Sequence, residues 1–262
     1  AKGDYEHLTR ANDAVDDIRI NDKKKFLQLK MLPCYILLSK SYILLNKKEE
    51  GSRFLSQSIL LAKKKLYEDA AENAAIFPVL AEVFKILKDS KGEHAMLLEY
   101  MNGMEKEVGK NHVAVSDCYH LLAGFCLRNK QIPLAIEYGE KCLANRLNHF
   151  GRINEVVDSS LYSLGLIYRA GGKLKEAFLT LLESIEIRTK LFGPTSLETA
   201  EAQESAGFTA YQMREFKKAH ILYKLSLDAR KTIYGNEHKA TKNVLKLYNT
   251  AQKALLTASK KG

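Results

Sequence analysis

The chain has 262 residues, of which 46% are hydrophobic and 27% are charged, and its formal net charge is +10. This length can bury a large core, so stability requires neither a disulfide nor a structural metal. The longest apolar stretch, residues 35–45, is interrupted by Ser39, Lys40 and Ser41, which argues against a membrane-spanning helix. The basic balance favours acidic partners, but the lysine clusters are spread along the chain and are typical of solvated surface. They lie at 23–25, 63–65, 217–218 and 260–261.

The first half of the chain shows helical periodicity, but its prolines and turns are irregularly placed. Leu8, Ala11 and Val15 fall on one helical face, which predicts either a lone capping helix or the second helix of an incomplete pair. Pro33 and Pro78 lie inside later apolar patterns and predict kinks. A turn is expected at 46–52, and a turn two residues longer than those later in the chain is expected before Ala95. The predicted helices are 3–21, 25–46, 53–66, 67–88 and 93–108.

The second half is more regular. Gly171 and Gly172 predict a turn, and Gly193 followed by Pro194 predicts the end of a helix. The last helix places apolar residues on one side and lysines on the other, as expected of a terminal cap. No strand-like alternation appears, so an all-α protein is predicted. The predicted helices are 112–129, 133–150, 153–170, 174–192, 195–213, 215–234 and 240–256.

One pattern recurs every 42 residues. Gly165 and Gly207 are separated by this interval, as are Ala177 and Ala219, and four glycines at 109, 151, 193 and 235 are equally spaced. Such a period indicates stacked helix pairs, none of which can bury its apolar face alone. We therefore predict one solenoid domain over residues 1–262, with a C-terminal capping helix at 240–256. Its five pairs would be 25–66, 67–108, 109–150, 151–192 and 193–234.

The key positions of the pairs follow one pattern: a large residue, a leucine three positions on, a small residue next, an aromatic three later and an alanine twelve after the small residue. In the fourth pair these are Leu161, Leu164, Gly165, Tyr168 and Ala177. The third and fifth pairs depart from it with Cys126 and Ala210 at the aromatic position. This pattern resembles the tetratricopeptide repeat. The longer period and the endings 188–193 and 230–235 are similar to the kinesin-light-chain-like variety. The resemblance implies a right-handed superhelix in which the first helices of the pairs line a concave, peptide-binding surface.

Two binding modes of the wider family do not match this sequence. The kinesin-light-chain-like variety carries an asparagine two residues before the small position, but here that position holds Leu37, Val79, Leu121, Ser163 and Ser205. The basic and amide residues with which chaperone-type domains clamp a carboxylate correspond to Ile36, Lys40, Val79, Asp117 and Leu121. Neither an asparagine ladder nor capture of a chaperone tail is therefore expected.

Catalytic and metal-binding motifs are weak in this sequence. Lys173 follows two glycines but lacks the earlier glycine of a phosphate-binding loop, and no H-E-x-x-H sequence is present. Asp117, Cys118 and His120 are the nearest approach to a metal cluster, yet Cys118 would point into the core while the other two face the groove. No enzyme activity, cofactor or metal is predicted.

The cysteines favour a reducing environment. Cys34, Cys118, Cys126 and Cys142 form no close pair, and the chain has no N-glycosylation sequon, so free thiols in the core and a cytoplasmic location are expected. The sequence begins at Ala1 without a Met and shows no basic-then-apolar secretory segment; we expect it to be a fragment of a longer protein, from which any targeting signal could have been removed.

Taken with the resemblance, these features predict a non-enzymatic adaptor that holds a peptide or helix of a partner protein in its groove. One alternative is the regulatory arm of a larger enzyme; another is a basic solenoid that binds nucleic acid or an anionic surface, which only the charge supports. No small molecule or membrane span is predicted. The expected groove residues are Asp117, His120, Arg128, Ser159, Tyr162, Ser163, Arg169, Glu201, Glu204, Phe208 and Tyr211.

Overall fold

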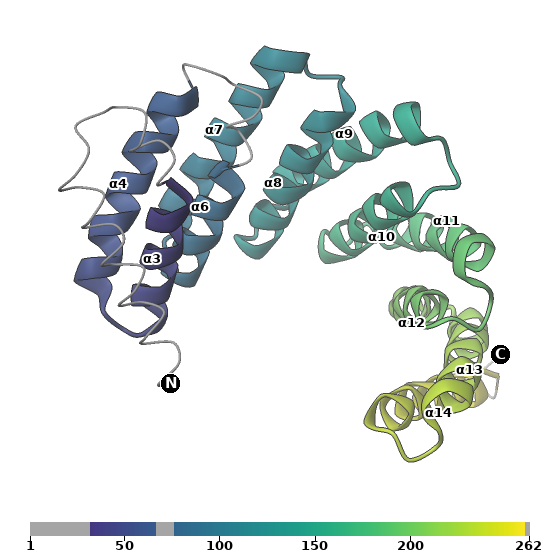
Figure 1. The fold of residues 1–262 in the computed structure, drawn as a ribbon. Coiled ribbons are helices and arrows are strands. Elements are labelled where there is room, and N and C mark those ends of the chain that lie inside the picture. Colours follow the sequence, from purple (N-terminus) through teal and green to yellow (C-terminus); the bar gives the residue numbers. More distant parts are fainter. Residues whose placement is uncertain (1–31, 67–75, 260–262) are drawn as a thin grey trace. The chain divides into compact units, whose positions relative to one another are not determined.

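The computed structural model describes residues 32–66 and 76–259, which divide between two compact units, residues 1–122 and 123–262 (Figure 1). Within the described ranges the regular structure consists of eleven α-helices and one 3₁₀ helix, with no strand. The prediction of an all-α protein is therefore confirmed. The helix expected at 3–21 lies outside the described residues.

In the first unit, α3 packs against α4 and α6 packs against α7. These helices contribute the antiparallel pairs expected from the repeat. Their bounds are α3 Leu32–Leu44, α4 Lys48–Leu66, α6 Ile76–Ile86 and α7 Ser90–Val108, followed by the 3₁₀ helix η1 Val113–Val115. Helix α8, Ser116–Arg128, begins in this unit and ends in the second.

In the second unit each helix from α9 to α14 packs against its neighbours in sequence. Within this unit, α10 and α12 lie on one side, and α11 and α13 lie on the other (Figure 1). The bounds are α9 Ile132–Phe150, α10 Glu155–Ala170, α11 Leu174–Phe192, α12 Leu197–Gln212, α13 Phe216–Tyr234 and α14 Lys239–Ser259.

The turn inside every pair has the same geometry. A residue with φ between 59° and 74° ends the first helix, and the next residue donates its amide to a carbonyl five positions earlier, as in Lys173 to Tyr168 at 2.9 Å. This bond closes a Schellman motif, for which glycine is the favoured residue because a Cβ destabilises the left-handed conformation. Only the fourth pair uses glycine. The left-handed residues are Asn46, Lys88, Lys130, Gly172 and Arg214, each 42 positions from the next.

The small residues allow the close helix contacts inferred from the sequence. A Cβ added to Gly165 would lie 2.8 Å from Leu181 Cγ, and one added to Gly207 would lie 3.0 Å from Tyr223 Cε1. Both distances are too short for a comfortable carbon–carbon contact, so glycine at this position lets the paired helix approach. Leu181 and Tyr223 are buried in one cluster between α11, α12, α13 and α14.

The prediction of a longer turn before Ala95 was wrong. The left-handed residue of the second pair, Lys88, keeps the 42-residue interval, and α7 begins at Ser90 with Asp89 as its N-cap. The residue twelve positions after Ala81 is Glu93, which is 7% exposed, whereas Ala95 is exposed. The preceding residue, Gly92, supplies the small surface instead, since its Cβ would overlap the ring of Phe84.

Other boundaries also differ from those predicted. Helix α4 begins at Lys48, so Gly51 lies inside a helix and not in the expected turn at 46–52. Gly51 packs there against Ile43, with 2.6 Å between an ideal Cβ and Ile43 Cγ1. Pro33 and Pro78 lie near the described starts of α3 and α6, so the predicted kinks at both prolines remain predictions.

Candidate functional site

Helices α10 and α12 lie side by side and share a face that carries most of the predicted groove residues. Ser159 is exposed, and Ser163 follows it by four positions, so both lie on the same side of α10. On α12 the ring of Phe208 is 40% exposed. We call this surface the α10–α12 face and define it by Ser159, Ser163, Arg169, Glu201 and Phe208.

Two contacts fix α10 against α12. The hydroxyls of Tyr162 and Ser205 are 2.9 Å apart, and Arg169 donates to the carbonyl of Ser205 at 3.2 Å. The guanidinium carbon of Arg169 also lies 5.1 Å from the centre of the Phe208 ring, a cation–π contact. Burial raises the pKa of Tyr162 and lowers the pKa of Arg169. Both groups still hold their protons near neutral pH, so Arg169 places a cation on this face, which also carries the carboxylate side chain of Glu201.

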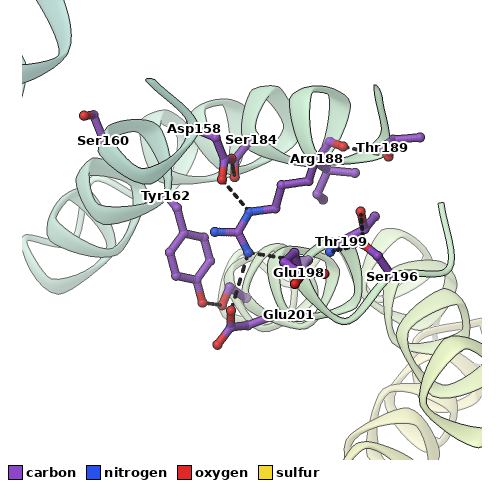
Figure 2. A network of polar contacts seen from close by, with 12 residues as sticks. Asp158, Ser160, Tyr162, Ser184, Arg188, Thr189, Ser196, Glu198, Thr199 and Glu201 are labelled. Atoms are coloured by element: carbon purple, nitrogen blue, oxygen red, sulfur yellow. Dashed lines mark hydrogen bonds and ion pairs between the residues drawn. The ribbon is translucent and has the colours of Figure 1, made fainter. Parts of the chain in front are cut away.

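A buried arginine network lies beneath this face (Figure 2). Arg188 of α11 donates from Nε to Asp158 at 2.8 Å, and Ser184 donates to the other oxygen of the same carboxylate at 2.5 Å. The guanidinium lies 4.3 Å from the centre of the Tyr162 ring and donates to the carbonyl of Glu198 at 2.7 Å. Because Glu198 opens the next pair, Arg188 joins three helices, α10, α11 and α12.

Arginines recur at this position through the second unit. Arg146 of α9 donates to Ser160 at 2.7 Å and to the carbonyl of Val156 at 3.3 Å, and Arg230 of α13 donates to Glu204 at 2.7 Å. Arg146, Arg188 and Arg230 are each 42 residues apart, and each precedes an aromatic residue and a glycine. Sequence reasoning noted the last two endings as family resemblance but missed the structural role of the arginine. The pattern Arg-x-x-x-aromatic-Gly, present three times, was the clue.

Several predicted groove residues therefore have structural partners within the chain. Tyr162 packs under Arg188, Glu204 pairs with Arg230, and Glu201 lies 3.4 Å from Arg188 while remaining largely exposed. Tyr211 is half-buried, and its ring centre lies 5.3 Å from that of Phe216. On α10 and α12, Ser159, Glu201 and Phe208 are the exposed members of the predicted set, and Ser163 is half-buried.

The remaining predicted residues lie on α8. Asp117 is exposed and His120 is half-buried in the first unit, whereas Arg128 is exposed in the second. Cys118 is fully buried, as expected, and burial raises the pKa of its thiol to about 12. Among the described residues no group of three or more His, Cys, Asp or Glu could hold a metal ion.

In the first unit an apolar side chain occupies the position where the kinesin-light-chain-like variety has asparagine. Leu37 is 62% exposed, Val79 43% and Leu121 36%. Lys40 and Glu82, one repeat apart, form an ion pair at 3.0 Å beside them. In the second unit the same position holds the half-buried Ser163 and Ser205. The two units therefore present different chemistry at equivalent positions.

None of the described helices has the length and apolarity needed to cross a membrane. The four cysteines are free; Cys118, Cys126 and Cys142 are buried, as predicted, whereas Cys34 is exposed.

Comparison with known proteins supports the repeat assignment. Residues 157–232 match the family model described as tetratricopeptide repeat. No curated protein sequence matches the chain. Among solved structures, BtubC (BKLC) from P. vanneervenii matches with a TM-score of 0.65 at 19% identity, covering 77% of this chain and 81% of that one.

A kinesin light chain with nearly identical TPR-like repeats from Podosopora anserina matches with a TM-score of 0.67 at 17% identity, covering 79% of this chain and 98% of that one. YrrB, described as a TPR protein with an unusual peptide-binding site, matches with a TM-score of 0.53 at 17% identity, covering 91% of this chain and 97% of that one. Residues 157–232 thus carry the tetratricopeptide repeat, and the fold of the chain is similar to that of kinesin-light-chain-like solenoids.

Proposed function

We propose that the protein is a non-enzymatic scaffold that holds a peptide segment of a partner protein on the α10–α12 face. The observation that carries the proposal is the exposed ring of Phe208 with Arg169 stacked on it, between serines on neighbouring first helices. A ring and a cation held by intramolecular contacts are pre-organised, which reduces the entropy lost on binding. The exposed hydroxyl of Ser159 and the half-buried hydroxyl of Ser163 on the same side of α10 supply hydrogen bonds for a peptide backbone.

The similarity to YrrB, whose structure is described as having a peptide-binding site, supports a peptide as the ligand class. The missing asparagine at Ser163 and Ser205 indicates that backbone recognition depends on shorter side chains than in kinesin light chains. Three buried free thiols support an adaptor that works in a reducing compartment.

The experiment pairs one substitution on this face with one on the opposite side of the unit. Partners captured from native cells would be identified by mass spectrometry, and their peptides titrated by calorimetry. Phe208→Ala should weaken peptide binding about tenfold or more, since aromatic anchors dominate such contacts. Ile221→Ala, at an exposed apolar position of α13, should leave the Kd unchanged.

Tyr162→Ala is unsuitable as a binding probe, because Tyr162 packs under the buried Arg188 and its loss would disturb the fold. Circular dichroism of the Phe208→Ala variant should match that of the natural chain. Equal peptide affinity of the natural chain and Phe208→Ala would overturn the assignment of the site.

A further inference from the structure

Ser205 of α12 is held by two side chains of α10. Its hydroxyl lies 2.9 Å from the hydroxyl of Tyr162, and its carbonyl accepts a hydrogen bond from Arg169 at 3.2 Å. Tyr162 and Arg169 are seven residues apart, close to two full turns, so both lie on the same side of α10, about 10 Å apart along its axis. Because they reach Ser205 from different turns, together they limit sliding of α12 along α10.

The same turn of α12 carries the exposed ring of the peptide site. Phe208 follows Ser205 by three residues, and Arg169 lies 5.1 Å from the centre of its ring while donating to the carbonyl of Ser205. A shift of Ser205 along α10 therefore also moves Phe208 relative to Arg169. The cation and the ring depend on the place of one serine, whose hydroxyl is bonded to Tyr162.

Direct contact between α10 and α12 is limited. Among the described helices, α10 packs chiefly against α9 and α11, and α12 packs chiefly against α11 and α13. That packing sets the approximate place of each helix, which leaves the final spacing of α10 and α12 to a few polar contacts. The ring of Tyr162 is itself held from below, because the guanidinium of Arg188 lies 4.3 Å from its centre (Figure 2). Its hydroxyl is therefore a fixed point from which Ser205 can be placed.

The next two first helices of the second unit, α12 and α14, lack this bridge. On α12 the equivalent of Tyr162 is Glu204, which pairs with Arg230 of α13 at 2.7 Å. On α14 the equivalent of Ser205 is Leu247, whose side chain cannot form a hydrogen bond. Stacking of the repeats therefore does not require a tyrosine–serine bridge. Its presence at the α10–α12 face connects it with the peptide site.

We propose that the hydroxyl of Tyr162 is a positioning group for the peptide site. Through Ser205 it keeps the side chains of Arg169 and Phe208 in the arrangement that a peptide binds. This inference rests on the function proposed above. It gives the hydroxyl an indirect role, separate from the packing of the ring on Arg188 and without contact to the peptide. An ordered site binds more tightly because less conformational entropy is lost on association.

The test compares the natural chain with Tyr162→Phe, which keeps the ring on Arg188 and removes only the hydroxyl. The probe is a dodecapeptide selected from a phage library on the natural chain and chosen because Phe208→Ala weakens its binding. Fluorescence anisotropy should give a Kd about fivefold higher for Tyr162→Phe than for the natural chain, as expected for the loss of one hydrogen bond. An unchanged Kd would overturn the proposal.

The matched control is Tyr168→Phe on the same helix. Tyr168 donates to Glu140 of α9 at 2.6 Å, so this variant also loses one tyrosine hydrogen bond between helices, but that bond does not involve α12. Its Kd for the dodecapeptide should equal that of the natural chain. An equal rise in Kd for Tyr168→Phe and Tyr162→Phe would show a general effect of lost stability and would contradict positioning.

A double variant separates an indirect role from direct contact with the peptide. In the Ser205→Ala chain the hydroxyl of Tyr162 has lost the serine through which it acts. Adding Tyr162→Phe to that chain should therefore raise the Kd by less than about twofold, because the two changes remove the same interaction. A further fivefold rise would mean that the hydroxyl binds the peptide itself, which the proposal excludes.

A measurement without peptide tests the positioning itself. The ring of Phe208 should shift the resonance of the Nε proton of Arg169, and Phe208→Ala gives the value without that ring. In Tyr162→Phe the resonance should move toward this value, whereas an unchanged resonance would overturn the proposal. If no dodecapeptide requires Phe208, the proposed function fails, and the resonance still decides whether Tyr162 positions Arg169.

Discussion

Arg188 is the residue on which the junction between the fourth and fifth helix pairs depends most. Its guanidinium neutralises the buried Asp158 and donates to the first turn of α12. Arg188→Met keeps the apolar volume but leaves the carboxylate buried without its ion partner. We expect the free energy of unfolding to fall by about 3–5 kcal/mol, measured by urea denaturation.

The matched control is Glu201→Ala. Glu201 also faces Arg188, but its side chain is 60% exposed, so its removal should cost less than about 1 kcal/mol. A double variant, Arg188→Met with Asp158→Asn, should lose less stability than Arg188→Met alone because no buried charge remains. Similar losses for Arg188→Met and Glu201→Ala would contradict a structural role for the buried pair.

The thiols give a second test at the scale of single residues. Burial raises the pKa of Cys118 from 9.0 to about 12 and raises that of Cys126. At pH 8 the native chain should therefore react with a thiol reagent rapidly at Cys34 and slowly at Cys118, Cys126 and Cys142, whereas the denatured chain should react at all four. Cys34→Ser should abolish the fast phase. A fast phase that survives this substitution would mean that a core thiol is accessible.

The same shift predicts how stability depends on pH. A thiol whose pKa is higher in the folded than in the unfolded state stays protonated on folding, so its contribution is complete below pH 9.0 and is lost as pH rises toward about 12. Alkaline unfolding followed by circular dichroism should shift to higher pH in Cys118→Ala, which removes this ionisation, once its curve is normalised to its own stability at pH 7.

At the scale of elements, the five turns differ in how well their sequence suits their backbone. Lys130 adopts φ of 60°, whereas Gly172 occupies the equivalent left-handed position without a Cβ. Lys130→Gly should raise the free energy of unfolding by about 0.5–1 kcal/mol, and Gly172→Ala should lower it by about 1 kcal/mol. Urea denaturation measures both changes.

The control for the turn substitutions is Lys173→Gly. Lys173 has φ of −78°, so glycine offers no relief there and only adds flexibility to the unfolded chain. That variant should be neutral or less stable than the natural chain. Stabilisation by both lysine-to-glycine changes would show that the left-handed conformation is not the cause.

The helices themselves were predicted well from the sequence, but the positions at which they begin and end were predicted less well. Periodic leucines and small residues determine a helix and its buried face locally, which is why 174–192 agrees with α11 at both ends. The prediction for the second pair was wrong because Glu93 stands where the pattern has alanine, and Ala95 fits the pattern only with a turn two residues longer. Only packing shows that Gly92 beneath Phe84 restores the close approach.

At the scale of the whole molecule, the second unit should fold without the first. Each helix from α9 to α14 contacts its sequence neighbours, and local contacts of this kind make stability nearly a sum over neighbouring repeats. A fragment of residues 113–262, which keeps α8 whole, should show a helical circular dichroism spectrum and a cooperative urea transition. A spectrum typical of an unfolded chain would show that the first unit is required.

The candidate site was predicted only in part. Helical spacing brought Ser159, Ser163 and Phe208 to one face, because that face follows from position within a repeat. Helical spacing could not show that Tyr162 and Glu204 contact other residues of the chain. Their partners, Arg188 and Arg230, lie 26 residues away on the next helix of the pair.

The sequence by itself determined the helical class, the 42-residue period and the pairing of neighbouring helices, because these depend on local propensity and on small residues at fixed intervals. Only the tertiary structure decided which polar residues are used internally and which stay exposed. It also showed that Glu204 pairs with Arg230 of α13 whereas the equivalent Lys246 of α14 is exposed, because the environment of a side chain depends on the helix packed against it.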